Sequence, residues 1–281
     1  MVRGNAGCIA RLCAAISFCI VIGGTTRAKA QTHSEYVTIP VFQVAHARPP
    51  QQPLTGQLLV PWGNGPFPVV ILLHGCGGVA ANEALWSDRL AGWGYASLIL
   101  NSFAARQVAS VCAPAYQPLV TPIDRAGDVM NAAAWLRNVP SVYGTRIGVL
   151  GLSHGGGTAA DVTRREFQQS APGLIKASVD YYGRCRDASA HGTVPLLALA
   201  GEDDTWGDPA RTCKEFATRL RPDQPFEVYT YPGTVHGFDN PRAQALREGE
   251  GHPIQYNHTA AEDSYARVKA FLDRYVGHAG R

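Results

Sequence analysis

Residues 147–157 read IGVLGLSHGGG, and this stretch decides the fold. Its first four apolar residues predict a buried strand, and Gly151-Leu152-Ser153-His154-Gly155 follows with the pattern G-x-S-x-G. A strand-to-helix turn of this kind is so tight that larger side chains two residues before or after the serine would collide. The hydroxyl of Ser153 then projects at a helix N-terminus, where the helix dipole favours developing negative charge. We therefore predict Ser153 as a nucleophile, with a purely structural Gly-rich turn as the alternative.

Short apolar runs of the same kind recur along the chain, and helical patterns separate most of them. The expected strands are residues 37–44, 54–61, 69–73, 95–100, 146–152, 177–181, 196–200 and 226–231. The first two alternate in hydrophobicity and predict an antiparallel pair, whereas the later runs are continuous, as in strands covered on both faces. The pattern predicts one α/β domain over residues 31–281, with a mostly parallel central sheet and helices on both faces. Active sites of such domains lie at the carboxyl ends of the strands.

Two helices carry clear end signals. Thr121-Pro122 predicts a cap and a first turn, and Val139-Pro140 predicts the end of the same helix. The last helix is expected to open with a capping box, Thr259–Glu262, and to stop at Gly277.

A serine hydroxyl is a poor nucleophile at neutral pH, so it needs a base and an acid that orients the base. The chain order expected for this fold is serine, acid, histidine. An acidic turn at residues 201–204 follows one predicted strand, and His236 follows the next. We predict Asp204 as the acid and His236 as the base, with Asp203 and Asp208 as fallback acids. A solvated loop or a helix cap is the alternative for this acidic cluster.

The loop His74-Gly75-Cys76-Gly77-Gly78 follows the first continuous apolar strand. Its glycines let the backbone approach a substrate, so we expect the N–H of Cys76 to help bind an oxyanion. The N–H of His154, directly after the nucleophile, is the expected second donor. Cys76 is a weaker candidate for the nucleophile because it lacks an elbow, and His74 is expected to have a structural role.

Four segments together resemble the dienelactone hydrolase family: residues 74–78, 151–157, 201–204 and 231–238. The resemblance covers nearly the whole chain after residue 31 in order and spacing. It implies an α/β-hydrolase fold and action on lactones and small esters. It also implies that Asp204, the third residue after the turn glycine, is the triad acid.

The chain departs from that family at the nucleophile. The namesake enzymes use cysteine, whereas Ser153 stands here, and this favours ordinary ester hydrolysis. The namesakes also hold the nucleophile with an early glutamate, which has no convincing counterpart between residues 37 and 61. Arg106 lies in a segment like the family's variable one. Its planar guanidinium could meet a substrate carboxylate, and a surface arginine is the equal alternative.

Residues 1–30 are typical of a cleaved signal peptide. Arg3 and Arg11 give a positive start, residues 12–22 are mostly apolar, and Ala28-Lys29-Ala30 gives a small-x-small cleavage pattern. The apolar run is shorter than the roughly 20 residues of a membrane span. We expect an exported protein, periplasmic or secreted, with no stable membrane insertion after cleavage. An uncleaved N-terminal anchor is the alternative.

Export bears on the cysteines. Three of the seven lie in the expected signal peptide, which leaves Cys76, Cys112, Cys185 and Cys213. An oxidising compartment favours two disulfides. Because Cys185 and Cys213 flank one predicted strand, we favour the pairs Cys185–Cys213 and Cys76–Cys112. Four buried free thiols are the alternative.

The remaining composition narrows the class of function. A net charge of +3 without a basic block gives no electrostatic support for nucleic-acid binding. No closely spaced metal-ligand pair and no dinucleotide or phosphate fingerprint is present, so we expect neither a metal nor a cofactor. The expected activity is hydrolysis of a small-molecule ester or lactone through an acyl-enzyme. The alternatives are a peptidase or acyltransferase with the same triad, or a catalytically silent hydrolase-like binding protein. The sequence leaves the substrate and the oligomeric state open.

Overall fold

The structure, a computed structural model, describes residue 1, residues 32–243 and residues 252–277. Within these residues, eight strands form one sheet in the order β1-β2-β4-β3-β5-β6-β7-β8. Their bounds are β1 Thr32–Ile39, β2 Leu54–Pro61, β3 Phe67–Leu73, β4 Ala96–Asn101, β5 Val142–Leu152, β6 Ile175–Tyr181, β7 Leu196–Gly201 and β8 Phe226–Tyr231. β2 pairs antiparallel with β1 and β4, and the other strands pair in parallel. The predicted α/β fold with a mostly parallel sheet is therefore confirmed.

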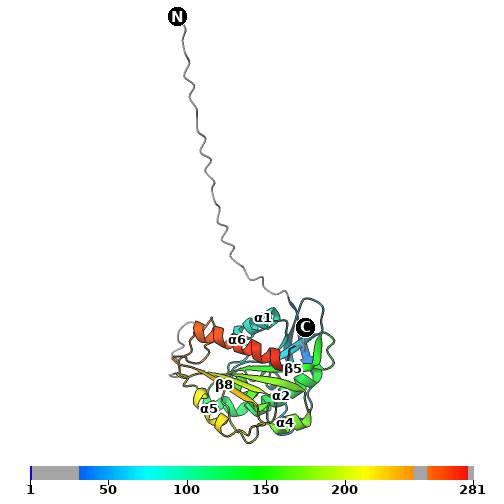
Figure 1. Cartoon of the computed structure of the whole chain (residues 1–281). Helices are drawn as coiled ribbons and strands as arrows, with labels where there is room; N and C mark the ends of the chain where they lie inside the picture. The colour runs from blue at the N-terminus through cyan, green and yellow to red at the C-terminus, as the bar shows by residue number, and fades with distance from the viewer. Residues whose placement is uncertain (2–31, 244–251, 278–281) are drawn as a thin grey trace.

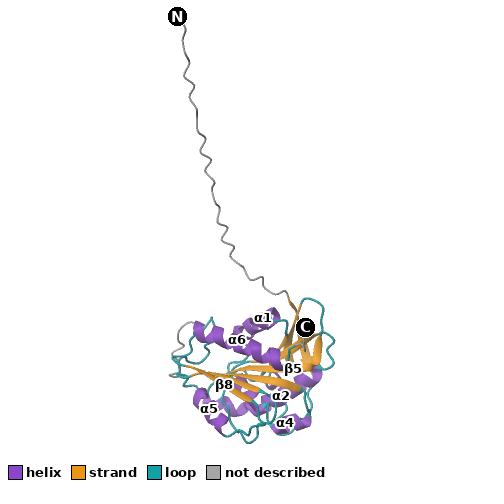
Figure 2. Cartoon of the chain, in the orientation of Figure 1, coloured by secondary structure: helices purple, strands orange, loops and turns teal. Residues whose placement is uncertain are grey.

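Helices cover both faces of this sheet. They are α1 Ala81–Gly92, α2 Pro122–Leu136, α3 His154–Asp161, α4 Arg165–Ser170, α5 Pro209–Thr218 and α6 His258–Tyr275, with 3₁₀ turns at Ala104–Arg106 and Pro114–Leu119. Figures 1 and 2 show α1 and α6 on one face, and α2, α4 and α5 on the other. The carboxyl ends of the parallel strands therefore open between two helical layers.

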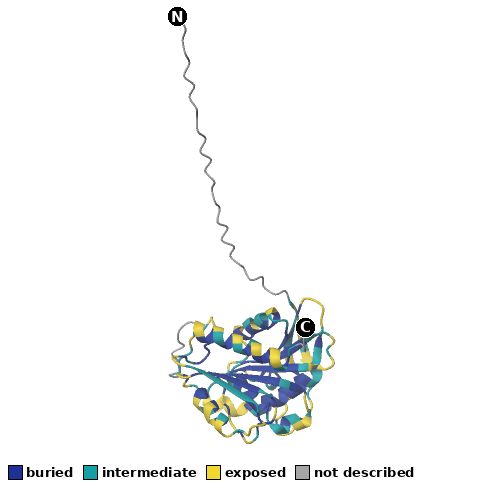
Figure 3. Ribbon diagram, viewed as in Figure 1, coloured by how far each residue is buried: buried dark blue, intermediate teal, exposed yellow. Residues whose placement is uncertain are grey.

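The side chains of β3 explain why its sequence is continuously apolar. Val69, Ile71 and Leu73 pack into the core on the α2 face, whereas Val70 and Leu72 join the core beneath α1 and α6. All five are at most 1% exposed. Figure 3 shows the same burial through the centre of the sheet. A strand covered on both faces has no position at which a polar side chain can reach water.

The first strand differs from its predicted bounds. An antiparallel pair with β2 is present, but β1 spans Thr32–Ile39 instead of residues 37–44. The chain leaves the sheet after Pro40 and packs against α2, where the N–H of Phe42 donates to Asn131 Oδ1 at 2.9 Å. Val44 joins the core of that face. Val41 and Val44 therefore pack into the core beside α2 rather than extend a strand.

The predicted cap of α2 is observed, and that of α6 is wrong. Thr121 Oγ1 accepts a hydrogen bond from the N–H of Asp124 at 3.2 Å. At α6 the cap is Asn257, whose Oδ1 accepts from the N–H of Ala260 at 3.2 Å, and Thr259 lies inside the helix. Asn ranks at least as high as Thr as an N-cap, and here it precedes the capping box by two residues.

The expected signal peptide, residues 1–30, lies outside the described residues apart from residue 1. In the part of the chain that the structure describes, none of the helices combines the length and the apolar character that a bilayer crossing requires.

Candidate active site

Ser153 lies at the sharp turn between β5 and α3. Its backbone has φ 55° and ψ −113°, a strained conformation for a residue with a side chain. A Cβ on Gly151 would lie 1.9 Å from the Gly155 carbonyl oxygen, and a Cβ on Gly155 would lie 2.3 Å from the Leu73 carbonyl oxygen. Both glycines are therefore required by steric contact. The N–H of Ser153 donates to the Tyr181 carbonyl at 2.9 Å, which ties the turn to the neighbouring strand.

The structure brings the three predicted side chains together. His236 Nε2 lies 2.8 Å from Ser153 Oγ, and His236 Nδ1 lies 2.7 Å from Asp204 Oδ2. The two partners follow the ends of β8 and β7, and both are buried. Of the two fallback acids, Asp203 is exposed and Asp208 pairs with Arg211 on α5. Asp204 is therefore the acid in contact with the imidazole.

Two aromatic residues that the sequence analysis did not identify hold the imidazole of His236. Trp206 stacks on it at 5.5 Å between ring centroids and an interplanar angle of 25°, and Tyr182 contacts it at 4.6 Å. The N–H of Trp206 also donates to Asp204 Oδ1 at 2.8 Å. Tyr182 follows β6 with φ 44°, so its backbone turns the ring toward the site. Asp204, His236 and the two rings therefore form one packed unit.

The loop that carries His236 is anchored through the buried carboxylate of Asp239. This carboxylate accepts hydrogen bonds from Trp86 Nε1 at 2.7 Å, Asn82 Nδ2 at 3.1 Å and the Tyr182 hydroxyl at 2.6 Å. Trp86 and Asn82 belong to α1, whereas Tyr182 follows β6. The donors come from two elements, so this carboxylate ties the loop of His236 to both of them. A charged acceptor makes each such bond stronger than a neutral one.

The glycine-rich loop after β3 is held from the opposite side. Cys76 forms a disulfide with Cys112, and its carbonyl accepts from the N–H of Val111 at 2.8 Å. His154 is the first residue of α3, so its N–H has no acceptor one turn earlier in the helix. The N–H groups of Cys76 and His154 are the two backbone donors that the sequence predicts for an oxyanion. His74 is buried and its Nδ1 donates to the Gly75 carbonyl at 2.8 Å.

A buried cation lies behind His154. Arg125 is fully buried, and its Nη1 donates to His154 Nδ1 at 2.8 Å. Burial lowers the pKa of Arg125 to about 9, and the negative charges of Asp128 and Glu83 oppose this shift. Arg125 therefore stays protonated at neutral pH. Burial, and then the positive charges of Arg125 and Arg186, lower the pKa of His154 to about 3. The imidazole is therefore neutral and accepts the bond.

Arg106, which the sequence offers as a substrate ligand, is engaged in an ion pair within the protein. Its guanidinium is 7% exposed and forms a bidentate ion pair with Asp128, at 2.7 and 3.0 Å. Arg106 lines neither of the two cavities at Ser153. A carboxylate of the protein itself therefore occupies the guanidinium, and Arg106 is not the exposed surface arginine that stood as the alternative.

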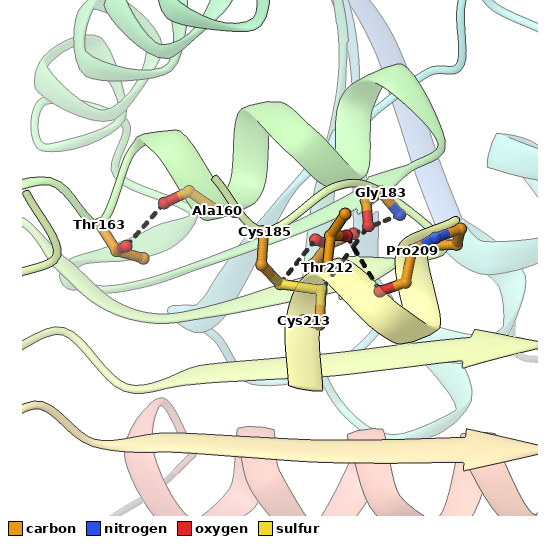
Figure 4. The surroundings of a disulfide bond; sticks show 8 residues. Ala160, Thr163, Gly183, Cys185, Pro209, Thr212 and Cys213 are labelled. Atoms are coloured by element: carbon orange, nitrogen blue, oxygen red, sulfur yellow. Dashed lines mark hydrogen bonds between the residues drawn. A yellow bond between two sulfur atoms is a disulfide. The ribbon is translucent and has the colours of Figure 1, made fainter. Parts of the chain in front are cut away.

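The cysteines pair as the sequence favours, Cys76 with Cys112 and Cys185 with Cys213. Figure 4 shows the second disulfide, which joins the segment after β6 to α5. Asp180 Oδ2 lies 3.8 Å from Cys185 Sγ. The side chains of Asp180, Cys185 and Cys213 are close enough together to resemble a set of metal ligands. Both sulfur atoms are engaged in the disulfide, so neither is a free thiolate for a metal.

Two cavities open at Ser153. One has a volume of about 410 Å³ and is lined by Arg184 and Arg186, and the other has a volume of about 290 Å³ and is lined by His236 and Glu83. Both are large enough for the two sides of a small ester. Ser153 therefore stands where they meet.

The family model described as "Dienelactone hydrolase family" matches residues 54–276. No curated protein sequence matches the chain. A putative dienelactone hydrolase from Klebsiella pneumoniae subsp. pneumoniae has a TM-score of 0.70 at 19% identity, over 87% of this chain and 100% of its own. A dienelactone hydrolase-like promiscuous phosphotriesterase from metagenomic libraries has 0.67 at 19%, over 88% and 99%. A dienelactone hydrolase from Anabaena variabilis has 0.61 at 18%, over 88% and 99%. At 18–19% identity, these three structures show that the chain shares their fold.

Proposed function

The chain belongs to the dienelactone hydrolase family, and from this premise we propose that it is a serine hydrolase that cleaves carboxylic ester or lactone bonds. One observation carries the proposal: two hydrogen bonds of 2.8 and 2.7 Å join Ser153 to His236 and His236 to Asp204. This is the geometry that activates a serine hydroxyl, because the base must reach the nucleophile while the acid fixes its tautomer.

The reaction proceeds in two halves. Ser153 Oγ attacks the carbonyl carbon as its proton passes to His236 Nε2, and the N–H groups of Cys76 and His154 bind the oxyanion. When the tetrahedral intermediate collapses, the carbon–oxygen bond to the alcohol breaks and His236 returns the proton to the leaving oxygen. Water then attacks the acyl-enzyme with His236 as base, and the acid product and free Ser153 are released.

Ser153→Ala tests the assignment. We expect kcat on a chromogenic ester to fall by roughly four to six orders of magnitude, with unchanged circular dichroism and unfolding midpoint. Ser170→Ala, an exposed serine on α4, is the matched control and keeps wild-type turnover. Full ester hydrolysis in Ser153→Ala would refute the proposal.

A fluorophosphonate probe separates an active hydrolase from a silent binding protein. We expect it to label Ser153 in the wild-type chain and in Ser170→Ala, and to leave Ser153→Ala unlabelled. Product analysis with a competing alcohol and with peptide substrates separates hydrolysis of esters from acyl transfer and peptidase activity. Absence of labelling in the wild-type chain would contradict the proposal.

We further propose that the protein works outside the cytoplasm, in the periplasm or as a secreted protein. Its two disulfides support this, because such bonds persist in oxidising compartments. Mass spectrometry of the protein recovered from fractionated cells of its source is the test. We expect an N-terminus at Gln31 and no free thiols.

A further inference from the structure

The two cavities at Ser153 share a common wall. Cys76, Cys112, Ser153, Tyr182 and Trp206 line both of them. An ester whose carbonyl lies at Ser153 Oγ can therefore extend one arm into each cavity. The charges of the two cavities then determine which ester fits.

We call the larger one, of about 410 Å³, the cationic cavity. Its charged lining side chains are Arg184 and Arg186, and its described lining includes neither Asp nor Glu. Both arginines are exposed, and neither takes part in the ion pairs found among the described residues. The buried carboxyl group of Asp161 interacts electrostatically with Arg186 without forming such a pair. A cavity of one sign with low-dielectric walls concentrates ligands of the opposite sign.

The backbone that carries these arginines is held in place. Arg184 and Arg186 flank Cys185, which the disulfide in Figure 4 joins to Cys213 on α5. Arg184 also lies directly over Gly207, where an added Cβ would be 2.0 Å from its Nε. Because both anchors are in the segments around the triad, the backbone that carries the two arginines is fixed at the wall of the cavity. Each presents a planar set of N–H donors that suits a carboxylate.

The second cavity, of about 290 Å³, has the opposite character. Glycine backbone and the apolar side chains of Leu152 and Ile254 form much of its wall, and its acidic lining residue is Glu83. An ionised Glu83 repels an anion, and a protonated Glu83 gives it no compensating charge. This cavity is therefore suited to a small uncharged group.

The triad assigns a side of the ester to each cavity. His236 lines the second cavity and is not part of the cationic one. Because the imidazole must protonate the departing alcohol oxygen, the alcohol leaves on the His236 side. The acyl chain then extends toward the elbow residue His154, which lines the cationic cavity.

We propose that the substrates are half-esters of dicarboxylic acids, with Arg184 and Arg186 binding the free carboxylate of the acyl chain and the second cavity taking a small uncharged alcohol. The inference rests on the proposed function and specifies its substrate class. Hydrolysis consumes one water and releases the alcohol and a dicarboxylate. The arginines take no part in the bond changes and act on binding and orientation.

Isomeric esters test the side of the charge. Monomethyl esters of dicarboxylic acids with two to five methylene groups carry the anion on the acyl side, and the isomeric acetoxyalkanoates carry it on the alcohol side. The dimethyl esters are the uncharged references. For the best chain length, we expect kcat/KM per ester group to be about ten- to one-hundredfold higher for the monomethyl ester than for the dimethyl ester, the range of charge-assisted hydrogen bonds. The acetoxy isomer gains no such preference.

Arg184→Gln/Arg186→Gln is the decisive variant, and Arg137→Gln is its control, because Arg137 is exposed at the end of α2 and lines neither cavity. We expect the preference for the monomethyl ester to fall to about one in the double variant and to persist in the control. In the wild-type chain it falls between low and high salt, as for any exposed ion pair.

The outcomes separate the two proposals. Hydrolysis of the dimethyl ester without a charge preference, or a preference that survives the double replacement, overturns the substrate class and leaves the serine hydrolase intact. A stronger preference for the acetoxy isomer overturns the assignment of the cavities. Failure to hydrolyse any ester, together with an unlabelled Ser153, overturns both proposals.

Discussion

The disulfide Cys76–Cys112 and the disulfide Cys185–Cys213 form a matched pair for testing the oxyanion loop. Their half-cystines are 36 and 28 residues apart in sequence. In the chain-entropy treatment, closing loops of these lengths stabilises the folded state by about 4 kcal/mol each, because the dependence on length is logarithmic. Replacing either pair by serines should therefore lower Tm by a similar amount, about 8–16 °C for a chain of this size.

Their effects on catalysis should differ. Cys76 carries one of the two proposed oxyanion donors, and loss of one such donor lowers kcat by about 10²–10³. We expect Cys76→Ser/Cys112→Ser, in which the loop is loosened but the donor remains, to lower kcat on an uncharged ester by about ten- to one-hundredfold. Cys185→Ser/Cys213→Ser should lower it by no more than a few-fold.

The assay is steady-state hydrolysis of an uncharged ester well below both unfolding midpoints, with the folded fraction measured by circular dichroism. Equal losses of kcat in the two double variants would show that general destabilisation explains both. Wild-type kcat in Cys76→Ser/Cys112→Ser would refute the role of the disulfide in holding the donor.

Three further predictions follow from buried groups. Burial raises the pKa of Glu83 from 4.5 to about 7, so its contribution to the stability of the fold is complete below pH 4.5 and is lost as pH rises through 7. Thermal melts between these pH values should show a smaller fall in Tm for Glu83→Gln than for the wild-type chain. Tyr182→Phe removes one donor to Asp239 and keeps the ring on His236, so urea titration should show a loss of about 1.5–3 kcal/mol with kcat within tenfold of wild type. Arg106→Ala leaves a buried carboxylate unpaired and should cost about 3–5 kcal/mol of unfolding free energy, and a raised KM without that loss would contradict the structural role.

The sequence predicts the central sheet and the three contacting side chains well for a physical reason. Strands buried on both faces must be continuously apolar. The elbow positions admit only glycine, because an added Cβ at Gly151 or Gly155 would collide with a backbone oxygen. Asp204 and His236 follow directly from the ends of two such strands. Motifs of this kind are local, so one sequence reveals them.

The remaining features depend on contacts between distant segments. The bounds of β1 depend on α2, which recruits residues 41–44 away from the sheet. Arg106 looks available in the sequence, but its partner Asp128 lies 22 residues later on another element. Arg125 and Tyr182 carry no local signal at all. Side chains of this kind acquire their roles only through packing, which a local pattern does not encode.

The carboxylate of Asp239 has a consequence for how the protein responds to heat. Since donors from α1 and from the end of β6 meet on it, the histidine loop cannot detach without exposing a charge and breaking the packing of both elements. We therefore expect the proposed active site to open only when the domain as a whole unfolds. Inactivation and loss of near-ultraviolet dichroism should consequently follow the same temperature curve, with no inactive but still native-like form in between.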